Sequence, residues 1–236
     1  MNKGFHEKFI AMFFLISPVF VEAANCEILD KSLCEAAEQG DVKAQTRLGA
    51  MYHVGNEVKK DYHQSFQWFN KAAQQGDSFS QGMLGQMYYS GEGVRQDYHQ
   101  AFQWFNKAAE QGDVLSQNML GQMYYDGLGV RQDYHQAFKW FNKVAGLGNA
   151  LSPAAQAMLG KMYFSGEGVR QDYHQAFQWF NKAAQQGDSL SQGMLGILYH
   201  DGLGVRQNKL LAKEWFGKSC DNGNQGGCDA YRDLYK

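Results

Sequence analysis

Apolar and small residues repeat along this chain at helical spacing, in two alternating patterns. The first pattern covers residues 80–90, where such residues fall three or four positions apart: Ser80, Met83, Leu84, Met87 and Tyr88. This spacing places them on one face of an α-helix. Gly91 follows directly, and a glycine at that point is a common left-handed cap. The pattern therefore predicts a helix that ends at Ser90.

A second helical pattern begins after Asp97. The Asp97 carboxylate can accept hydrogen bonds from free backbone N–H groups of the first turn, and Gln100 is placed to complete a capping box. The apolar face that follows comprises Tyr98, Ala101, Phe102, Phe105, Ala108 and Ala109. Gly112 ends the pattern. Residues 91–96 contain two glycines, which adopt positive φ without strain, so the two patterns together predict a helical hairpin.

This hairpin recurs along the chain. Leu-Gly pairs at 48–49, 84–85, 120–121, 159–160 and 195–196 are separated by steps of 36, 36, 39 and 36 residues. The same steps separate Asp61, Asp97, Asp133 and Asp172, each of which opens an Asp-Tyr-His-Gln run. A fixed period in this range indicates stacked units, each of which completes its core only against a neighbour. The sequence predicts an all-α protein, an α/α solenoid (superhelix) of about five hairpins with terminal capping helices.

The period also sets the expected boundaries. We expect a solenoid over residues 24–236, with an N-terminal cap over 26–41, repeats over about 42–77, 78–113, 114–149, 150–188 and 189–224, and a C-terminal cap over 225–236. The longer step adds three residues near Asn149, and Ser152-Pro153 after it is a good helix start. Three interpretations of this insertion are open: a bend in the solenoid, a specificity element, or neutral variation.

Gly85 and its equivalents lie inside the first helix of each hairpin. A glycine there costs about 1 kcal/mol relative to alanine. We expect this cost to be offset by a close approach of the second helix through its small residues Ala101 and Ala108.

The N-terminus resembles a secretory signal peptide over residues 1–23. Lys3 and Lys8 flank the start of an apolar run over 9–21, and small residues follow at Ala23 and Ala24. The run is shorter than the roughly 20 residues that a transmembrane helix needs, although a membrane anchor and a lipid anchor on Cys26 remain alternatives. The prediction is a periplasmic or secreted protein without a membrane span after cleavage. Disulfides are expected in such a compartment.

Composition narrows the class of partner. The chain is 44% hydrophobic and carries 22 Lys and Arg against 24 Asp and Glu, a net charge of -2. There is no basic excess of the kind that nucleic acid selects. The sequence has no Ser-x-x-Lys, Gly-x-Ser-x-Gly or His-Glu-x-x-His motif and no glycine-rich phosphate loop. We therefore expect no catalytic residues and no cofactor.

One histidine per repeat forms a ladder: His63, His99, His135 and His174. Packed helices lie about 10 Å apart, whereas the ligand nitrogens of a shared metal ion lie about 2 Å from it. One ion cannot bind histidines of two neighbouring repeats, so we expect these histidines to be solvated first-turn residues and not to form a metal site.

The repeat is similar to a known family. Met83-Leu84-Gly85, Tyr88, Gly91-x-Gly93-Val94, Asp97, Ala101, Trp104-Phe105 and Lys107-Ala108-Ala109 resemble the Sel1-like repeat, a relative of the tetratricopeptide repeat. The resemblance covers five units and departs locally at Glu57 and at Asn208. It implies a scaffold or adaptor whose superhelical groove accepts a peptide or a partner domain.

The cysteines add to this resemblance. Cys220 and Cys228 are similar in spacing to pairs in the cysteine-rich exported bacterial branch, which implies a disulfide between the last hairpin and the cap. Cys26 and Cys34 have the same separation. On one continuous helix they would be about 12 Å apart, beyond disulfide reach. We therefore expect Cys26 to precede the helix and to fold back on Cys34.

Stacked first helices present equivalent positions side by side as one surface. The outward positions expected from the pattern are Gln81, Gln86 and Tyr89, with Gln117, Gln122, Tyr125, Gln156, Lys161, Phe164, Gln192, Ile197 and His200 in later repeats. The predicted partner-binding residues are Gln86, Tyr89, Gln122, Tyr125, Lys161 and Phe164. In the alternative interpretation, the tyrosines pack between repeats and the glutamines only solvate the helices.

The sequence thus favours an exported protein–protein interaction scaffold or adaptor. A weak β-lactam-binding or hydrolysing protein of the cysteine-rich type, and a purely structural spacer, are the alternatives. The sequence identifies neither the partner nor an oligomeric state.

Overall fold

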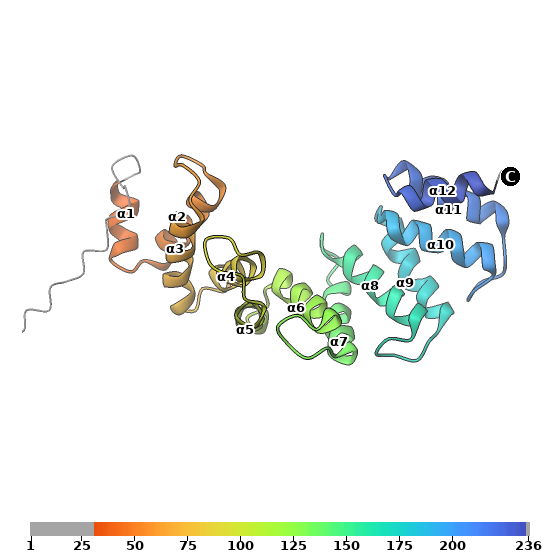
Figure 1. Ribbon diagram of the computed structural model, residues 1–236, viewed down its shortest axis with the longest axis horizontal. Coiled ribbons are helices and arrows are strands. Elements are labelled where there is room, and N and C mark those ends of the chain that lie inside the picture. The colour runs from red at the N-terminus through yellow and green to blue at the C-terminus, as the bar shows by residue number, and fades with distance from the viewer. Residues whose placement is uncertain (1–30, 235–236) are drawn as a thin grey trace, which may run out of the picture.

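The computed structural model describes residues 31–234, in which all regular structure is helical. Figure 1 shows the helices following one another along the long axis, with α1 near one end and α12 at the other. The helices are α1 (Lys31–Glu38), α2 (Val42–Val54), α3 (Tyr62–Gln74), α4 (Ser78–Ser90), α5 (Tyr98–Glu110), α6 (Val114–Asp126), α7 (Tyr134–Ala145), α8 (Ser152–Ser165), α9 (Tyr173–Gln185), α10 (Ser189–Asp201), α11 (Lys209–Asp221) and α12 (Gln225–Asp233).

The helices form five hairpins, from α2–α3 to α10–α11, with α1 and α12 as caps. Each first helix packs against the second helix of its own hairpin and against that of the preceding hairpin. Neighbouring first helices also contact each other, as α4 does with α6 and α8 with α10, whereas second helices make no comparable contacts with one another. First helices therefore lie on the inner side of the curve. The predicted all-α solenoid is confirmed.

Helix ends follow the expected chemistry, with one correction. The Asp97 carboxylate accepts from the backbone N–H of His99 at 2.9 Å and of Gln100 at 3.0 Å, and Gly91 caps α4 with φ 77°. The reciprocal half of the predicted capping box is wrong, because the Asp97 N–H donates instead to the Tyr88 carbonyl at 2.9 Å. This bond fixes the end of the loop to the preceding helix.

The close approach at Gly85 exists, but its partner differs from the expected one. A Cβ atom at Gly85 would lie 2.6–2.9 Å from three ring atoms of Phe105, which is fully buried. Equivalent glycines in the other hairpins meet equivalent phenylalanines. The expected contact through Ala101 and Ala108 is wrong, since it is the flat face of an aromatic ring that occupies the space left by the missing side chain.

Neighbouring hairpins are joined by a second glycine and by a tryptophan. Gly129, in the loop after α6, has φ 69°, and a Cβ there would overlap the Tyr98 carbonyl at the start of α5. Trp104 packs against a core cluster shared by α3 of the preceding hairpin and α4 of its own, and the Lys107 ammonium covers its ring at 4.0 Å. Trp104 is therefore a packing residue where two hairpins meet.

The N-terminal cap is α1. It buries Cys34 and Ala37 against the first hairpin, and Cys34 is disulfide-bonded. Its predicted partner Cys26 and the predicted signal peptide over 1–23 lie outside the described residues. Among residues 31–234, no helix combines the length and the apolar character that crossing a bilayer requires.

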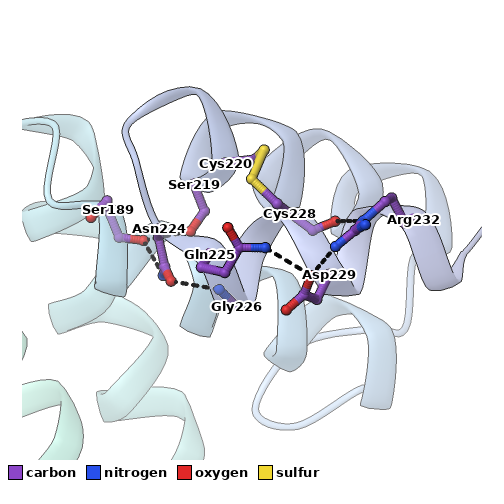
Figure 2. Close-up of a disulfide and its surroundings, with 9 residues drawn as sticks. All are labelled: Ser189, Ser219, Cys220, Asn224, Gln225, Gly226, Cys228, Asp229 and Arg232. Atoms are coloured by element: carbon purple, nitrogen blue, oxygen red, sulfur yellow. Dashed lines mark hydrogen bonds and ion pairs between the residues drawn. A yellow bond between two sulfur atoms is a disulfide. The ribbon is translucent and has the colours of Figure 1, made fainter.

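The predicted Cys220–Cys228 disulfide is confirmed and joins α11 to α12, with 4.4 Å between the two Cα atoms (Figure 2). Close packing supports the same junction, because a Cβ at Gly227 would lie 2.6 Å from the Cβ of Ser219. Asn224 caps α12 by accepting from the Gly226 N–H at 3.0 Å. The short cap is therefore held by a covalent bond, a helix cap and one tight contact.

Replacing both Cys220 and Cys228 by serine should lower the free energy of unfolding by about 2–3 kcal/mol, because the short covalent loop restricts the unfolded chain. Urea denaturation followed by circular dichroism measures this change. Amide hydrogen exchange should rise first in α12, which is terminal and short. Unchanged exchange in α12 would show that packing alone holds the cap.

Candidate partner-binding face

The inner side of the solenoid presents one row of residues per first helix, spaced four and three positions apart. This spacing places the three residues of a row on one helix face. We call the whole set the inner stripe: Lys43, Arg47 and Ala50 in α2, Phe79, Met83 and Gln86 in α4, Leu115, Met119 and Gln122 in α6, Ala154, Met158 and Lys161 in α8, Leu190, Met194 and Ile197 in α10, and Gly226, Ala230 and Asp233 in α12.

Several apolar members of the inner stripe are exposed to solvent. Phe79 is 53% exposed, Leu115 43% and Leu190 67%. The methionines of the same rows are partly buried. Methionine is flexible and polarizable, and it is common on surfaces that accept varied partners.

Three of the predicted site residues belong to the inner stripe: Gln86, Gln122 and Lys161. Gln86 is partly exposed, and Gln122 donates a hydrogen bond to the Asp126 carboxylate at 2.6 Å. Lys161 is exposed. Each amide or ammonium group thus stands beside the apolar members of its own row.

The aromatic site residues lie three positions further along each helix and stack within their own hairpin. The ring centroids of Tyr89 and Tyr98 are 5.2 Å apart, and Phe164 meets Tyr173 in the same edge-on manner at 5.3 Å. Tyr125 is only 7% exposed. The rings of Tyr89, Tyr125 and Phe164 are therefore packed within their hairpins and are not fully exposed on the inner face.

Tyr125 is also tied to the next hairpin. Its hydroxyl donates a hydrogen bond to the Glu167 carboxylate at 2.5 Å. Burial, followed by the hydrogen bond and the charge of Glu167, raises the pKa of the Tyr125 phenol well above its ordinary value. The hydroxyl is thus held protonated as a donor and contributes to the stacking of two hairpins.

The outward placement expected for one glutamine per repeat is wrong. The structure buries Gln81 between hairpins, where its amide donates to the Ala73 carbonyl at 3.1 Å and its oxygen accepts from Gln111 at 2.7 Å. Helical spacing alone could not distinguish this face from the exposed one, because glutamine occurs on both, as Gln81 and Gln86. The equivalent residues Gln45, Gln117, Gln156 and Gln192 are buried in the same way.

A hollow of about 580 Å³ opens on the inner face between α8, α10 and α12. Its walls are mainly apolar, and Lys161 is the only charged residue among them. Of the predicted residues, the hollow brings together Lys161 and Phe164, whereas Gln86, Tyr89, Gln122 and Tyr125 belong to other hairpins. The main apolar side chains of the lining are Met158, Phe164, Leu190, Met194 and Ile197.

Sequence reasoning did not select Met158, Leu190 or Met194. A signal for the hollow was nevertheless present, because its lining departs from the repeat consensus. Lys161 and Ile197 occupy the position where the second and third repeats carry glutamine. In an array of nearly identical units, such departures mark the place where one unit differs in surface chemistry.

The histidine ladder lies away from this hollow, on the second helices. The His99 ring lies 3.2 Å through Nδ1 from the Gly129 carbonyl of the next hairpin, and His174 meets Gly204 in the same way at 3.3 Å. Across residues 31–234, no three histidine, cysteine or acidic side chains are grouped as metal ligands would be. The ladder therefore links the first turn of a second helix to the following loop.

Comparisons with known proteins agree with the repeat period. The Sel1 repeat model matches residues 42–77, 78–113, 114–149, 153–188 and 189–224. The three residues before Pro153 thus fall between two matched units. No curated protein matches the chain.

Solved structures share both sequence and architecture with this chain. It is 41% identical to c5321, a protective antigen present in uropathogenic Escherichia coli strains that displays an SLR fold, with a TM-score of 0.81 over 90% of this chain and 44% of the antigen. The chain thus spans less than half the length of that antigen. A Sel1 repeat protein from Oxalobacter formigenes is 30% identical, with a TM-score of 0.77 over 84% of this chain and 80% of that one.

Proteins with this fold commonly mediate protein–protein interactions and generally act as scaffolds without catalysis. The matched units cover most of the chain, and the structural likeness extends across them. The sequence resemblance is thereby confirmed, and the chain belongs to the Sel1 repeat family.

Proposed function

We propose that this protein is an exported scaffold that binds a peptide or a partner protein on the inner face of its solenoid. The observation that carries the proposal is the apolar hollow of about 580 Å³ between α8, α10 and α12. Ligand-binding pockets occupy about 300–1,000 Å³ and are lined mainly by apolar side chains. The hollow meets both conditions.

A macromolecular partner fits this surface better than a small molecule. The hollow is open toward the inner face, and exposed apolar side chains continue beyond it at Leu115 and Phe79, in hairpins further along the array. Large exposed apolar patches on a folded protein commonly mark an interaction site. A ligand that covered all of these positions would have to extend across several hairpins.

Export is part of the proposal. The Cys220–Cys228 disulfide suits an oxidising compartment, since cytosolic proteins rarely keep structural disulfides. The predicted signal peptide over residues 1–23 supports the same location, in the periplasm or outside the cell. The mature N-terminus determined by mass spectrometry would identify the cleavage site expected after Ala23.

Site-specific photocrosslinking in the native cell tests the interaction. A photoreactive amino acid placed at Ile197, on the wall of the hollow, should form adducts with partner protein. The matched control is the same amino acid at Lys139, an exposed position on α7, which is a second helix. Adducts at position 197 and none at 139 are expected. Equal labelling at both positions, or none at 197, would contradict a binding role for the inner face.

A further inference from the structure

The inner stripe is positively charged, although the protein as a whole is not. The complete chain has a net charge of -2. The inner stripe contains three basic residues, Lys43, Arg47 and Lys161, against one acidic residue, Asp233, at its C-terminal end. The inner stripe itself thus has a net charge of +2, three basic residues less one acidic, while Asp126 and Glu167 lie beside it, hydrogen-bonded to Gln122 and Tyr125.

None of these three cations is neutralised by an ion pair. The ion pairs among residues 31–234 involve Lys31, His53, His200 and Arg232 and leave the three stripe cations without a carboxylate partner. All three are exposed. Charged groups that face each other across an interface are usually complementary in sign, so these cations favour a partner with carboxylates.

Of the three cations, Lys161 says most about the chemistry of the partner, because it lies at the apolar hollow. Its ammonium group stands over the Tyr125 ring, 4.7 Å from the centroid. That ring is itself fixed by the hydrogen bond to Glu167. The repeats before it carry Ala50, Gln86 and Gln122 at this position, so the cation is specific to the hairpin that borders the hollow.

The wall of the hollow also contains a polar group without a hydrogen-bond partner. Ser191 lines the hollow and is fully buried, yet its hydroxyl has no hydrogen-bond partner. A buried hydroxyl without a partner lowers the stability of the fold. In the first hairpins the equivalent Ser80 hydroxyl is 3.0 Å from that of Thr46, whereas Ala157 stands in the place of the threonine beside Ser191.

We infer that the occupant of the inner face is an acidic segment of a partner protein that carries large apolar side chains. Its apolar side chains enter the hollow between α8, α10 and α12. A carboxylate next to them pairs with Lys161, and further carboxylates meet Lys43 and Arg47 toward the N-terminal end. This inference rests on the proposed function, and it adds the chemistry of the partner.

Other classes of ligand fit the surface less well. Nucleic acid requires a dense row of cations along its phosphates, whereas exposed apolar side chains separate Arg47 from Lys161 on the inner stripe. A lipid surface favours protruding apolar groups with basic residues beside them, but here the exposed Phe79 and Leu115 belong to rows without a cation, and the apolar groups near Lys161 line a hollow. A chain segment can enter such a hollow, and a bilayer cannot.

Selection from a random dodecapeptide display library tests the inference with the full exported chain as bait. Enriched peptides should combine at least two large apolar residues with two or more acidic residues. The affinity of such a peptide should fall about tenfold or more in Lys161→Glu, because the cation becomes a repulsive charge. Lys139→Glu changes the net charge equally on an outer helix and should leave the affinity unchanged.

The charge swap gives the sharper readout. A peptide whose acidic residues are replaced by lysine should bind Lys161→Glu better than it binds the natural protein. Enrichment of basic peptides, no enrichment, or equal effects of Lys161→Glu and Lys139→Glu would overturn the inference. Circular dichroism of each variant establishes that it is folded before affinities are compared.

Two further outcomes separate the inference from the function on which it rests. If crosslinking at Ile197 captures a partner but selection yields no acidic peptide, the chemistry is wrong and the binding face stands. If sedimentation shows a dimer that Ile197→Glu dissociates, the occupant is a second copy of this chain. That result would overturn the inference as well.

Discussion

Gly129→Ala is expected to lower the free energy of unfolding by about 3–4 kcal/mol. Gly129 has φ 69°, and a left-handed conformation costs an ordinary residue about 1–2 kcal/mol. The larger part comes from the added Cβ, which would overlap backbone atoms of Tyr98 and lie 2.7 Å from the His99 nitrogen. These atoms belong to the first turn of α5, so relief requires two hairpins to separate. Urea denaturation followed by circular dichroism measures the change.

Gly112→Ala supplies the matched control. Gly112 also has positive φ, at 95°, but a Cβ there meets no atom within 4 Å. Only the conformational cost of about 1–2 kcal/mol applies. A loss as large as that of Gly129→Ala would show that backbone strain, rather than contact between hairpins, determines the stability of the array.

Gly85→Ala is expected to destabilise the protein by about 2 kcal/mol, although alanine is the better helix former by about 1 kcal/mol. The added methyl group would lie 2.6 Å from the Phe105 ring, and overpacking a filled core costs about 1–3 kcal/mol or more. The buried ring has no free space to enter. In a Phe105→Leu background the penalty should shrink, which a double-mutant cycle measures directly.

Gly82→Thr, one turn earlier in the same helix, should have the opposite sign. Its Cβ would lie 3.1 Å from the hydroxyl of Ser116, which is buried without a hydrogen-bond partner. Thr46 of the first hairpin makes such a contact with Ser80 of the second, at 3.0 Å between the two hydroxyl oxygens. We expect a gain of about 1 kcal/mol from helix propensity and the restored hydrogen bond. If Gly82→Thr lowered the free energy of unfolding as Gly85→Ala does, the proposed hydrogen bond between the introduced threonine and Ser116 would be wrong.

The proposed binding face combines a cation with apolar side chains, and local sequence patterns revealed only part of it. Lys161 and Phe164 were predicted from their outward positions on a helical face, equivalent to Gln86 and Tyr89. Their apolar neighbours Met194 and Leu190 were not predicted to belong to the site, because a methionine or leucine at helical spacing is equally compatible with a place in the core. Whether such a side chain belongs to the core or to the surface depends on whether the next hairpin covers it.

The sequence by itself determined the helices, their caps and the period of the array. These features depend on residues at most a few positions apart, such as Asp97 and the backbone amides that it caps. A repeated local pattern therefore identifies a repeated local structure.

Only the tertiary structure decided which polar residues are buried, what fills the space beside Gly85 and where the inner face opens into a hollow. Gln81 and Gln86 lie on one helix and differ little in sequence context, yet one bonds to the preceding hairpin and the other lies on the inner stripe. The hollow lies between first helices of successive hairpins, α8, α10 and α12. Burial depends on contacts between different helices, such as those of Gln81 with Ala73 and of Gly85 with Phe105. The curvature of the array arises only when the hairpins stack.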